Sequence, residues 1–330
     1  MNAKAVLAAK LAGAALTLAS IAFLAISFFR LDFSGLPRVA GIVPWLAALA
    51  LSACYALTVG VQGLAWHSTL SFLAPVKPRV SATLSAYARA NIGKYLPGNV
   101  MHFVGRNYFG ARLGLSQADM AMGTALEIAS LALTAAFLSI ACAAASGSLA
   151  ATLDLFGGGR IVFIAGAAVV ALLALALLAA FAASGKLRRA LYRIGARLSA
   201  AKKRSAGRGF RGRAPAYLLA LYSLYVLNFL IHASVIVAAS RVFLGTSLSV
   251  DKAIALSAAY LAAWLVGFVV PGPPGGIGVR EAAFLMLAGP LLGPSGALAL
   301  AAVSRAICVA GDGLAYAAAL AVRMPPAVKK

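Results

Sequence analysis

Long apolar runs alternate with short polar connections along the whole 330-residue chain. Runs near twenty residues are long enough to cross the hydrocarbon core of a bilayer as α-helices. The pattern predicts six full transmembrane helices, at residues 5–29, 42–66, 120–145, 161–183, 215–240 and 295–322. The fold class expected from this pattern is therefore an all-α polytopic membrane protein.

Two further hydrophobic units, at residues 81–115 and 253–290, are each interrupted in the middle by glycine and proline. The first is broken at Pro97-Gly98, and the second contains three prolines and four glycines between residues 271 and 278. Lipid cannot satisfy loose backbone groups, so non-helical backbone at membrane depth must be wrapped in protein or line a wet cavity. We interpret both units as re-entrant helical hairpins, although two full crossings would give the same topology.

Composition agrees with this class, because 63% of the residues are hydrophobic and only 11% are charged. The net charge of +22 would otherwise indicate a nucleic-acid partner. Eleven of the 29 Lys and Arg residues, however, lie between positions 186 and 213, in one long loop at 184–214. That clustering is typical of the positive-inside rule and also suits contact with anionic lipid headgroups. We therefore expect no nucleic-acid partner.

The basic residues also orient the chain. Connections assigned to the cytoplasmic side hold eighteen Lys and Arg, and those assigned outside hold five. Both termini are therefore expected in the cytoplasm. The first apolar run is longer than a typical signal-peptide core and lacks a convincing cleavage site, so we expect a retained span.

The two interrupted units match each other at one constant offset along the chain. Both read G-x3-P-G-x7-R, which aligns Gly93, Pro97, Gly98 and Arg106 with Gly267, Pro271, Gly272 and Arg280. The flanking spans match at the same offset, so residues 1–150 and 151–330 form two halves. Each half has an odd number of crossings, which predicts the inverted-repeat plan of many secondary transporters, with a site between the halves.

This arrangement predicts an anion site. The free N–H groups and the positive dipole end of a half-helix that starts after Pro-Gly bind phosphate readily. Two arginines lie about two turns further on and could add bidentate contacts, and glycines allow close backbone approach. The residues predicted to bind a phosphate-bearing lipid headgroup are Lys94, Gly98, His102, Arg106, Gly275, Gly276, Arg280 and Glu281.

Some of these side chains have a structural interpretation as well. Arg280 and Glu281 could form an ion pair that fixes the hairpin, although a buried pair is a poor source of stability alone. Glu127 could pair with Arg106 or Arg112, or it could carry protons. Glu127, Arg305 and Asp312 are the candidate gating or coupling residues, although Arg305 and Asp312 could instead be helix partners or line the path. Asn228 and His232 are expected to form interhelical hydrogen bonds.

The segments KYLPGNVMHFVGR and PGGIGVREAAFL resemble the flippase-like integral membrane proteins related to the membrane domain of lysylphosphatidylglycerol synthases, the multiple peptide resistance factors. The resemblance runs from Ala3 to Val322 and is specific at the two hairpins. It implies a bacterial-type inner-membrane protein that moves lipids or lipid-linked groups between leaflets. The chain ends at Lys330 without the soluble aminoacyl-transferase domain of those synthases, so we do not expect it to make lysyl-lipid.

The function expected from the sequence is a flippase for a phosphate-bearing lipid, and not an enzyme. Alternatives from other classes are an anion or small-solute channel or transporter, and an intramembrane lipid-modifying enzyme. No G-x4-G-K-[ST] motif or metal-ligand spacing is present, so we expect no cofactor and either an ion gradient or a passive process. A homo-oligomer is compatible with the sequence.

Overall fold

The computed structural model describes residues 42–74, 76–96, 101–148, 214–270 and 274–324. This part of the chain is helical throughout, with seven α-helices and two short 3-10 turns. In chain order they are α2 (Val43–Leu73), α3 (Val80–Asn91), η2 (Ile92–Tyr95), α4 (Met101–Arg112), α5 (Gln117–Ala145), α9 (Ala214–Leu244), α10 (Val250–Val269), η4 (Pro274–Gly276) and α11 (Val279–Leu320). The predicted spans at 5–29 and 161–183, and all but the last residue of the loop at 184–214, lie outside the described residues.

Five of the described helices are long and apolar enough to cross a membrane, so the chain is a multi-pass membrane protein. α2, α5, α9 and the second part of α11 correspond to the predicted spans at 42–66, 120–145, 215–240 and 295–322. α2 continues beyond the predicted end to Leu73, and the Thr69 hydroxyl in this extension donates to the Ala65 carbonyl at 2.9 Å. α10, with 20 residues, is also a candidate span.

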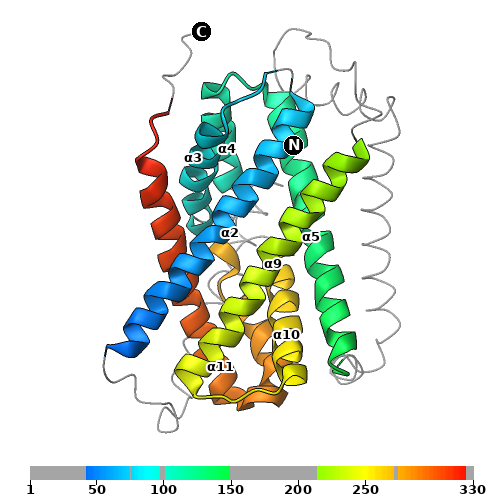
Figure 1. The fold of residues 1–330 in the computed structure, drawn as a ribbon, viewed down its shortest axis with the longest axis vertical. Coiled ribbons are helices and arrows are strands. Elements are labelled where there is room, and N and C mark those ends of the chain that lie inside the picture. The colour runs from blue at the N-terminus through cyan, green and yellow to red at the C-terminus, as the bar shows by residue number, and fades with distance from the viewer. Residues whose placement is uncertain (1–41, 75, 97–100, 149–213, 271–273, 325–330) are drawn as a thin grey trace, which may run out of the picture.

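Two helix pairs point toward each other from opposite ends of the molecule (Figure 1). α3 and α4 occupy one end, and α10 with the first part of α11 occupies the other. The two turns η2 and η4 contact each other where the pairs meet, in the middle of the molecule. α2 packs along α9, and α10 packs against α5 and α11. The long helices therefore enclose the point where the two interrupted units of the sequence meet.

α11 is bent at Gly293, where the chain reverses direction between the inner hairpin and the last long arm. Gly293 has φ 73° and ψ 157°, a backbone conformation open almost only to glycine. Pro290 and Pro294 flank it and remove two backbone donors from the helix. The sequence thus builds the turn that returns α11 across the molecule.

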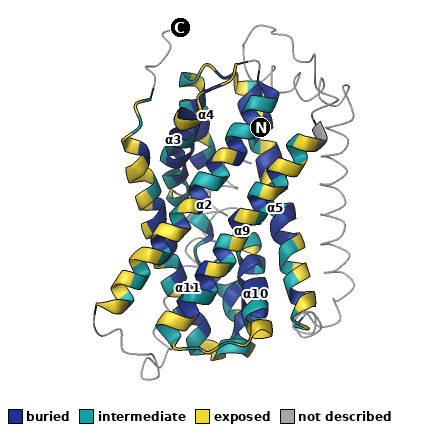
Figure 2. Ribbon diagram, in the orientation of Figure 1, coloured by how far each residue is buried: buried dark blue, intermediate teal, exposed yellow. Residues whose placement is uncertain are grey.

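The apolar side chains separate into a core and an outer surface. A large core cluster joins α2, α9, α10 and α11 around Tyr225, Phe229, Tyr260 and Phe284. Large apolar side chains such as Trp45 and Leu219 are exposed on the outward faces of α2 and α9 (Figure 2). Apolar side chains thus occupy both the core and the outer surface, as expected for helices that face lipid tails rather than water.

Candidate functional site

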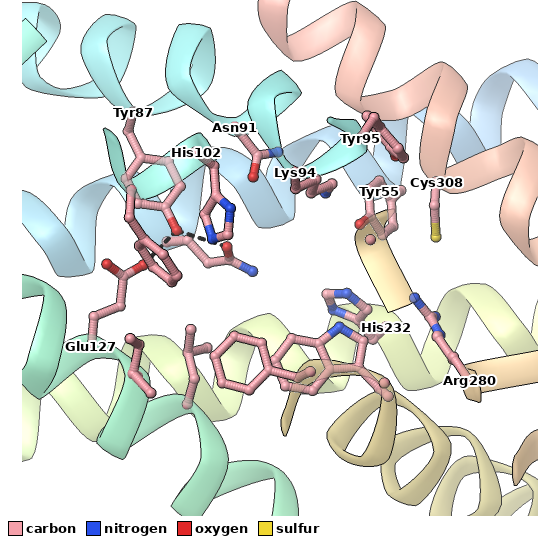
Figure 3. Close-up of a pocket in the computed structure, with 18 of the residues that line it drawn as sticks. Tyr55, Tyr87, Asn91, Lys94, Tyr95, His102, Glu127, His232, Arg280 and Cys308 are labelled. Atoms are coloured by element: carbon pink, nitrogen blue, oxygen red, sulfur yellow. Dashed lines mark hydrogen bonds between the residues drawn. The ribbon is translucent and has the colours of Figure 1, made fainter. Parts of the chain in front are cut away.

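A cavity of about 100 Å³ lies where the two hairpins meet (Figure 3). All seven described α-helices and both 3-10 turns contribute to its lining. Its charged and imidazole-bearing residues are Lys94, His102, Arg106, Glu127, His232, Arg280 and Arg305. Four cations and one carboxylate thus line a space large enough for several water molecules.

Arg106, on α4, is buried against Glu127 of α5, and the two form an ion pair. The Tyr87 hydroxyl donates to the other carboxylate oxygen of Glu127 at 2.6 Å. The Arg106 guanidinium also stacks on the Tyr87 ring, 3.9 Å from its centroid. Of the two partners that the sequence offered for Glu127, the structure confirms Arg106. The charge of this arginine is therefore already neutralised within its own half of the protein.

Lys94, on η2, forms an ion pair of 2.7 Å with Asp312 of α11. Asn91 donates to Asp312 at 2.7 Å, and the Tyr95 hydroxyl donates to its other oxygen. Asp312 is almost fully buried, so three donors from the end of α3 and from η2 compensate its charge. One carboxylate of the last helix thus holds the tip of the first hairpin.

The second hairpin tip is held by the same helix arm. Arg305, two turns before Asp312, donates to the carbonyl oxygen of Gly275 at 2.9 Å and lies 3.8 Å from Glu281. Glu281 also accepts the backbone N–H of Gly278 at 2.6 Å, which satisfies one free donor at the start of α11. The predicted Arg280–Glu281 pair is therefore replaced by contacts of Glu281 with Arg305 and its own helix start.

Arg280 differs from the other cations of the cavity. Its guanidinium lies over the Tyr260 ring, 4.6 Å from the centroid. Its Nη2 atom is buried, and no acceptor among the described residues lies within hydrogen-bond distance of it. None of the described carboxylates forms an ion pair with it. Nε of Arg106 is also buried without a partner among the described residues, but Arg106 has a carboxylate beside it and Arg280 does not. A buried guanidinium without a counter-ion is unfavourable, so this position favours an anionic ligand.

Two histidines also face the cavity. His232, on α9, is buried and its Nδ1 atom lies 2.8 Å from the carbonyl oxygen of Asn228, one turn earlier. Its other ring nitrogen has no partner among the described residues, and neither does Nδ1 of His102. The expected interhelical bond at this position is made by Asn228, which accepts from Gln62 of α2 at 2.9 Å.

The predicted headgroup-binding residues fall into three groups. Lys94, His102, Arg106, Gly275 and Arg280 line the cavity, as do Glu127 and Arg305 from the predicted gating set. Gly276, Glu281 and Asp312 do not line it but contact residues that do. Gly98 lies outside the described residues, as do Pro97 and residues 271–273. The binding role of every one of these residues stays a prediction.

Sequence reasoning missed the aromatic part of the lining. Tyr55, Tyr87, Tyr95, Phe103, Trp264 and Phe268 all face the cavity. The sequence does contain an indication of these aromatic contacts, because Tyr87 and Tyr260, which carry a hydroxyl on an aromatic ring, lie within the first arms of the two interrupted units. Each carries a stacked arginine in the structure.

A sequence model of the family described as "Lysylphosphatidylglycerol synthase TM region" matches residues 9–311, which is nearly the whole chain. The resemblance expected from the two hairpin segments is thereby confirmed. No curated protein matches the chain.

Proposed function

Because the chain belongs to the family of the lysylphosphatidylglycerol synthase TM region, we propose that it moves a phosphate-bearing lipid between the leaflets of the membrane. Family membership points to a function that concerns membrane lipids. Translocation of a phospholipid, an aminoacylated phospholipid or a polyprenyl-phosphate-linked lipid is the finer statement that we add.

The observation that carries this proposal is Arg280 in the lining of the central cavity, which has a buried Nη2 atom without an acceptor and no ion pair among the described residues. Arginine binds phosphate oxygens with paired, charge-assisted hydrogen bonds. The other three cations of the lining have protein acceptors, through Asp312, Glu127 and Gly275. Arg280 is thus the position at which a lipid phosphate would supply the missing acceptor.

The predicted internal repeat relates two arginines whose surroundings differ. Arg106 and Arg280 correspond at the offset between the two halves, and each stacks on a tyrosine of the preceding helix. The same offset carries Glu127 onto Ala301, which has no carboxylate. The first half therefore neutralises its arginine and the second half does not. We propose that this difference makes the second hairpin the phosphate-binding one.

The hairpins support an alternating-access cycle. Their tips meet in the middle of the molecule, as expected for two re-entrant hairpins that enter from opposite leaflets. A cavity of about 100 Å³ is smaller than the roughly 300–1,000 Å³ of sites that enclose organic ligands. A whole headgroup would therefore enter when the tips separate, while its acyl chains stay in the lipid.

We place the protein in a bacterial-type inner membrane with both termini in the cytoplasm, as the distribution of Lys and Arg favours. In this orientation the basic loop at 184–214 faces the anionic cytoplasmic leaflet. The proposal includes no enzymatic step and no cofactor. It leaves association into homo-oligomers open.

A small-anion channel or transporter is the second candidate, and the size of the cavity favours it. In this conformation the space admits a few water molecules or a small ion more readily than a headgroup. A lipid-modifying enzyme is the third class, and it would change its lipid covalently. Both alternatives are separable from lipid translocation by experiment.

The test is leaflet exchange in liposomes. Purified protein would be reconstituted with acyl-labelled fluorescent phospholipids or a labelled polyprenyl phosphate, and exchange followed by bleaching of the outer leaflet. We expect exchange that requires the protein and falls about tenfold or more in Arg280→Ala, since a charge-assisted contact to phosphate is lost.

Arg241→Ala is the matched control, because this arginine is also helical but is exposed near the end of α9. It should leave exchange unchanged. Absence of exchange with every lipid, under imposed pH or sodium gradients as well, would overturn the proposal. Chloride or phosphate flux would then favour the channel, and a mass change of the lipid would favour the enzyme.

A further inference from the structure

The unpartnered nitrogen of His232 has a defined chemical character. A carbonyl oxygen only accepts, so the contact of Nδ1 with Asn228 requires the proton to be on Nδ1. The neutral ring then keeps a lone pair on Nε2. This atom is buried and has no donor among the described residues, and it belongs to a residue that is only 1% exposed and lines the cavity. It is an unused hydrogen-bond acceptor beside the candidate ligand site.

The ring is fixed in this orientation by its neighbours. Tyr55 makes an edge contact with it at 5.2 Å between centroids, and Phe229, Trp264 and Tyr260 surround it at 5.8, 6.3 and 6.4 Å. An aromatic enclosure restricts rotation of the imidazole and also tolerates an ammonium group. The acceptor is therefore positioned in advance of binding.

We propose that His232 is a specificity-determining residue that selects a phosphate ester whose substituent carries a hydroxyl or ammonium hydrogen. Arg280 takes a phosphate oxygen, and Nε2 of His232 accepts a hydrogen bond from the group esterified to that phosphate. The two residues line one cavity and do not bond each other, so a single ligand with both chemistries would satisfy them together.

Figure 3 shows the arrangement. His232 and Arg280 come from different helices and lie on the same side of the cavity, while Lys94, His102 and Asn91 lie across from them. A headgroup with a phosphate alone would leave the imidazole lone pair without a donor. Sites built to hydrogen-bond a substrate hydroxyl reject analogues that lack it, because the buried polar atom is left unpaired.

This inference rests on the proposed function, but the same chemistry could come from a soluble phosphate ester. The test therefore uses a lipid pair and a soluble pair. Acyl-labelled phosphatidylglycerol and phosphatidylethanol are both singly charged phosphodiesters, and the glycerol group alone carries hydroxyls. Radiolabelled glycerol 3-phosphate and ethyl phosphate form the corresponding soluble pair for uptake into the same vesicles.

In liposomes we expect wild-type protein to exchange phosphatidylglycerol about tenfold faster than phosphatidylethanol, the effect of one buried hydrogen bond. His232→Phe keeps a ring of similar shape but removes the acceptor, so the ratio should fall to about one. His232→Gln retains an acceptor and should keep part of the preference. His67→Phe is the matched control, since His67 does not line the cavity.

The outcomes are distinguishable. Equal rates for the two lipids in wild type, with exchange that still needs Arg280, would overturn the role of His232 and leave the flippase proposal intact. If no lipid exchanges but glycerol 3-phosphate enters in preference to ethyl phosphate, the proposed role of His232 is supported. The ligand is then a soluble phosphate ester, and the flippase proposal is overturned. Failure of both pairs overturns both proposals. The wild-type ratios decide the matter even if His232→Phe does not fold.

Discussion

At the scale of the residue, the buried charges near the cavity are held by partners on other helices and turns. Arg106 and Glu127 are 3% and 1% exposed, so neither charge is solvated by bulk water. Such a pair adds little stability compared with well-packed apolar residues, yet removal of one partner leaves the other charge buried alone. This asymmetry gives a way to separate a structural role of Glu127 from a transport role.

Glu127→Ala should destabilise the protein by about 3–5 kcal/mol, because Arg106 loses its carboxylate. The double variant Arg106→Met with Glu127→Met should recover most of the lost stability. Melting temperatures of the purified proteins in detergent would measure both effects. Asp251→Asn, at an exposed position in the first turn of α10, is the control and should change little. Equal stability of Glu127→Ala and wild type would rule out the structural role.

The sequence predicted some of these contacts and not others. Glu127 lies 21 residues from Arg106, and both belong to neighbouring helices, so their pairing could be foreseen. Lys94 and Asp312 lie in opposite halves of the sequence, and no local pattern connects them. The lone pair on His232 depends on the carbonyl that its other nitrogen meets, which only the folded helix defines.

At the scale of the element, the bend of α11 depends on a single residue. Gly293→Ala should cost about 1–3 kcal/mol, because φ 73° with ψ 157° is strained for any residue with a Cβ. Apart from its chain neighbours and the adjacent helix backbone, no atom of the described residues lies within 4 Å of the place that a Cβ would occupy there, so the cost would come from the backbone conformation. Gly289→Ala is the matched control, with equally open space and no positive φ.

Gly289→Ala should be neutral or stabilising, since alanine is favoured over glycine within a helix by about 1 kcal/mol. Thermal unfolding of the two variants side by side would measure the difference. A loss of stability in both variants, or in neither, would show that the bend does not depend on the conformation of Gly293.

The last arm of α11 is the element that joins both hairpin tips, through Asp312 to η2 and through Arg305 to Gly275 of η4. Asp312→Asn removes the charge that holds Lys94 and should loosen the first tip. We expect amide hydrogen exchange in residues 92–96 to rise about tenfold, with the peptides of α9 unchanged. Unaltered exchange at the tip would mean that the ion pair does not restrain it.

The order of the elements could be predicted from the sequence because proline and glycine mark each interruption of a hydrophobic unit. The short charged helices α3 and α4 correspond to the unit predicted at 81–115, and α10 with the start of α11 corresponds to 253–290, with α3 beginning one residue and α10 three residues earlier than predicted. The helix starts were less readable. α11 begins only at Val279, well after Gly272, because Gly275, Gly276 and Gly278 all adopt positive φ before the helix can form.

At the scale of the whole molecule, the proposed repeat predicts that the two arms of each hairpin approach each other at equivalent positions. A Cβ on Gly93 would lie 2.8 Å from the backbone nitrogen of His102, and one on Gly276 would lie 2.7 Å from the carbonyl oxygen of Gly267. These two contacts join equivalent positions, because the offset that aligns the halves carries Gly93 onto Gly267 and His102 onto Gly276. Each hairpin thus brings its two arms together at a pair of positions that the predicted offset relates.

The proposed repeat also predicts a substitution that should prevent Arg280 from binding phosphate. Ala301 occupies the position that corresponds to Glu127, so Ala301→Glu should place a carboxylate where the second half lacks one. If it pairs with Arg280 as Glu127 pairs with Arg106, the guanidinium is no longer available to a phosphate. Lipid exchange in liposomes should then fall about tenfold or more, as in Arg280→Ala.

Packing must be separated from charge in this experiment, because Ala301 is buried and a larger side chain there strains the core by about 1–3 kcal/mol. Ala301→Gln has nearly the same size and no charge, so it is the matched control. Exchange that is lost in Ala301→Glu and largely kept in Ala301→Gln would attribute the loss to the charge of Arg280. Equal loss in both would attribute it to packing, and the asymmetry between the halves would then not explain which hairpin binds phosphate.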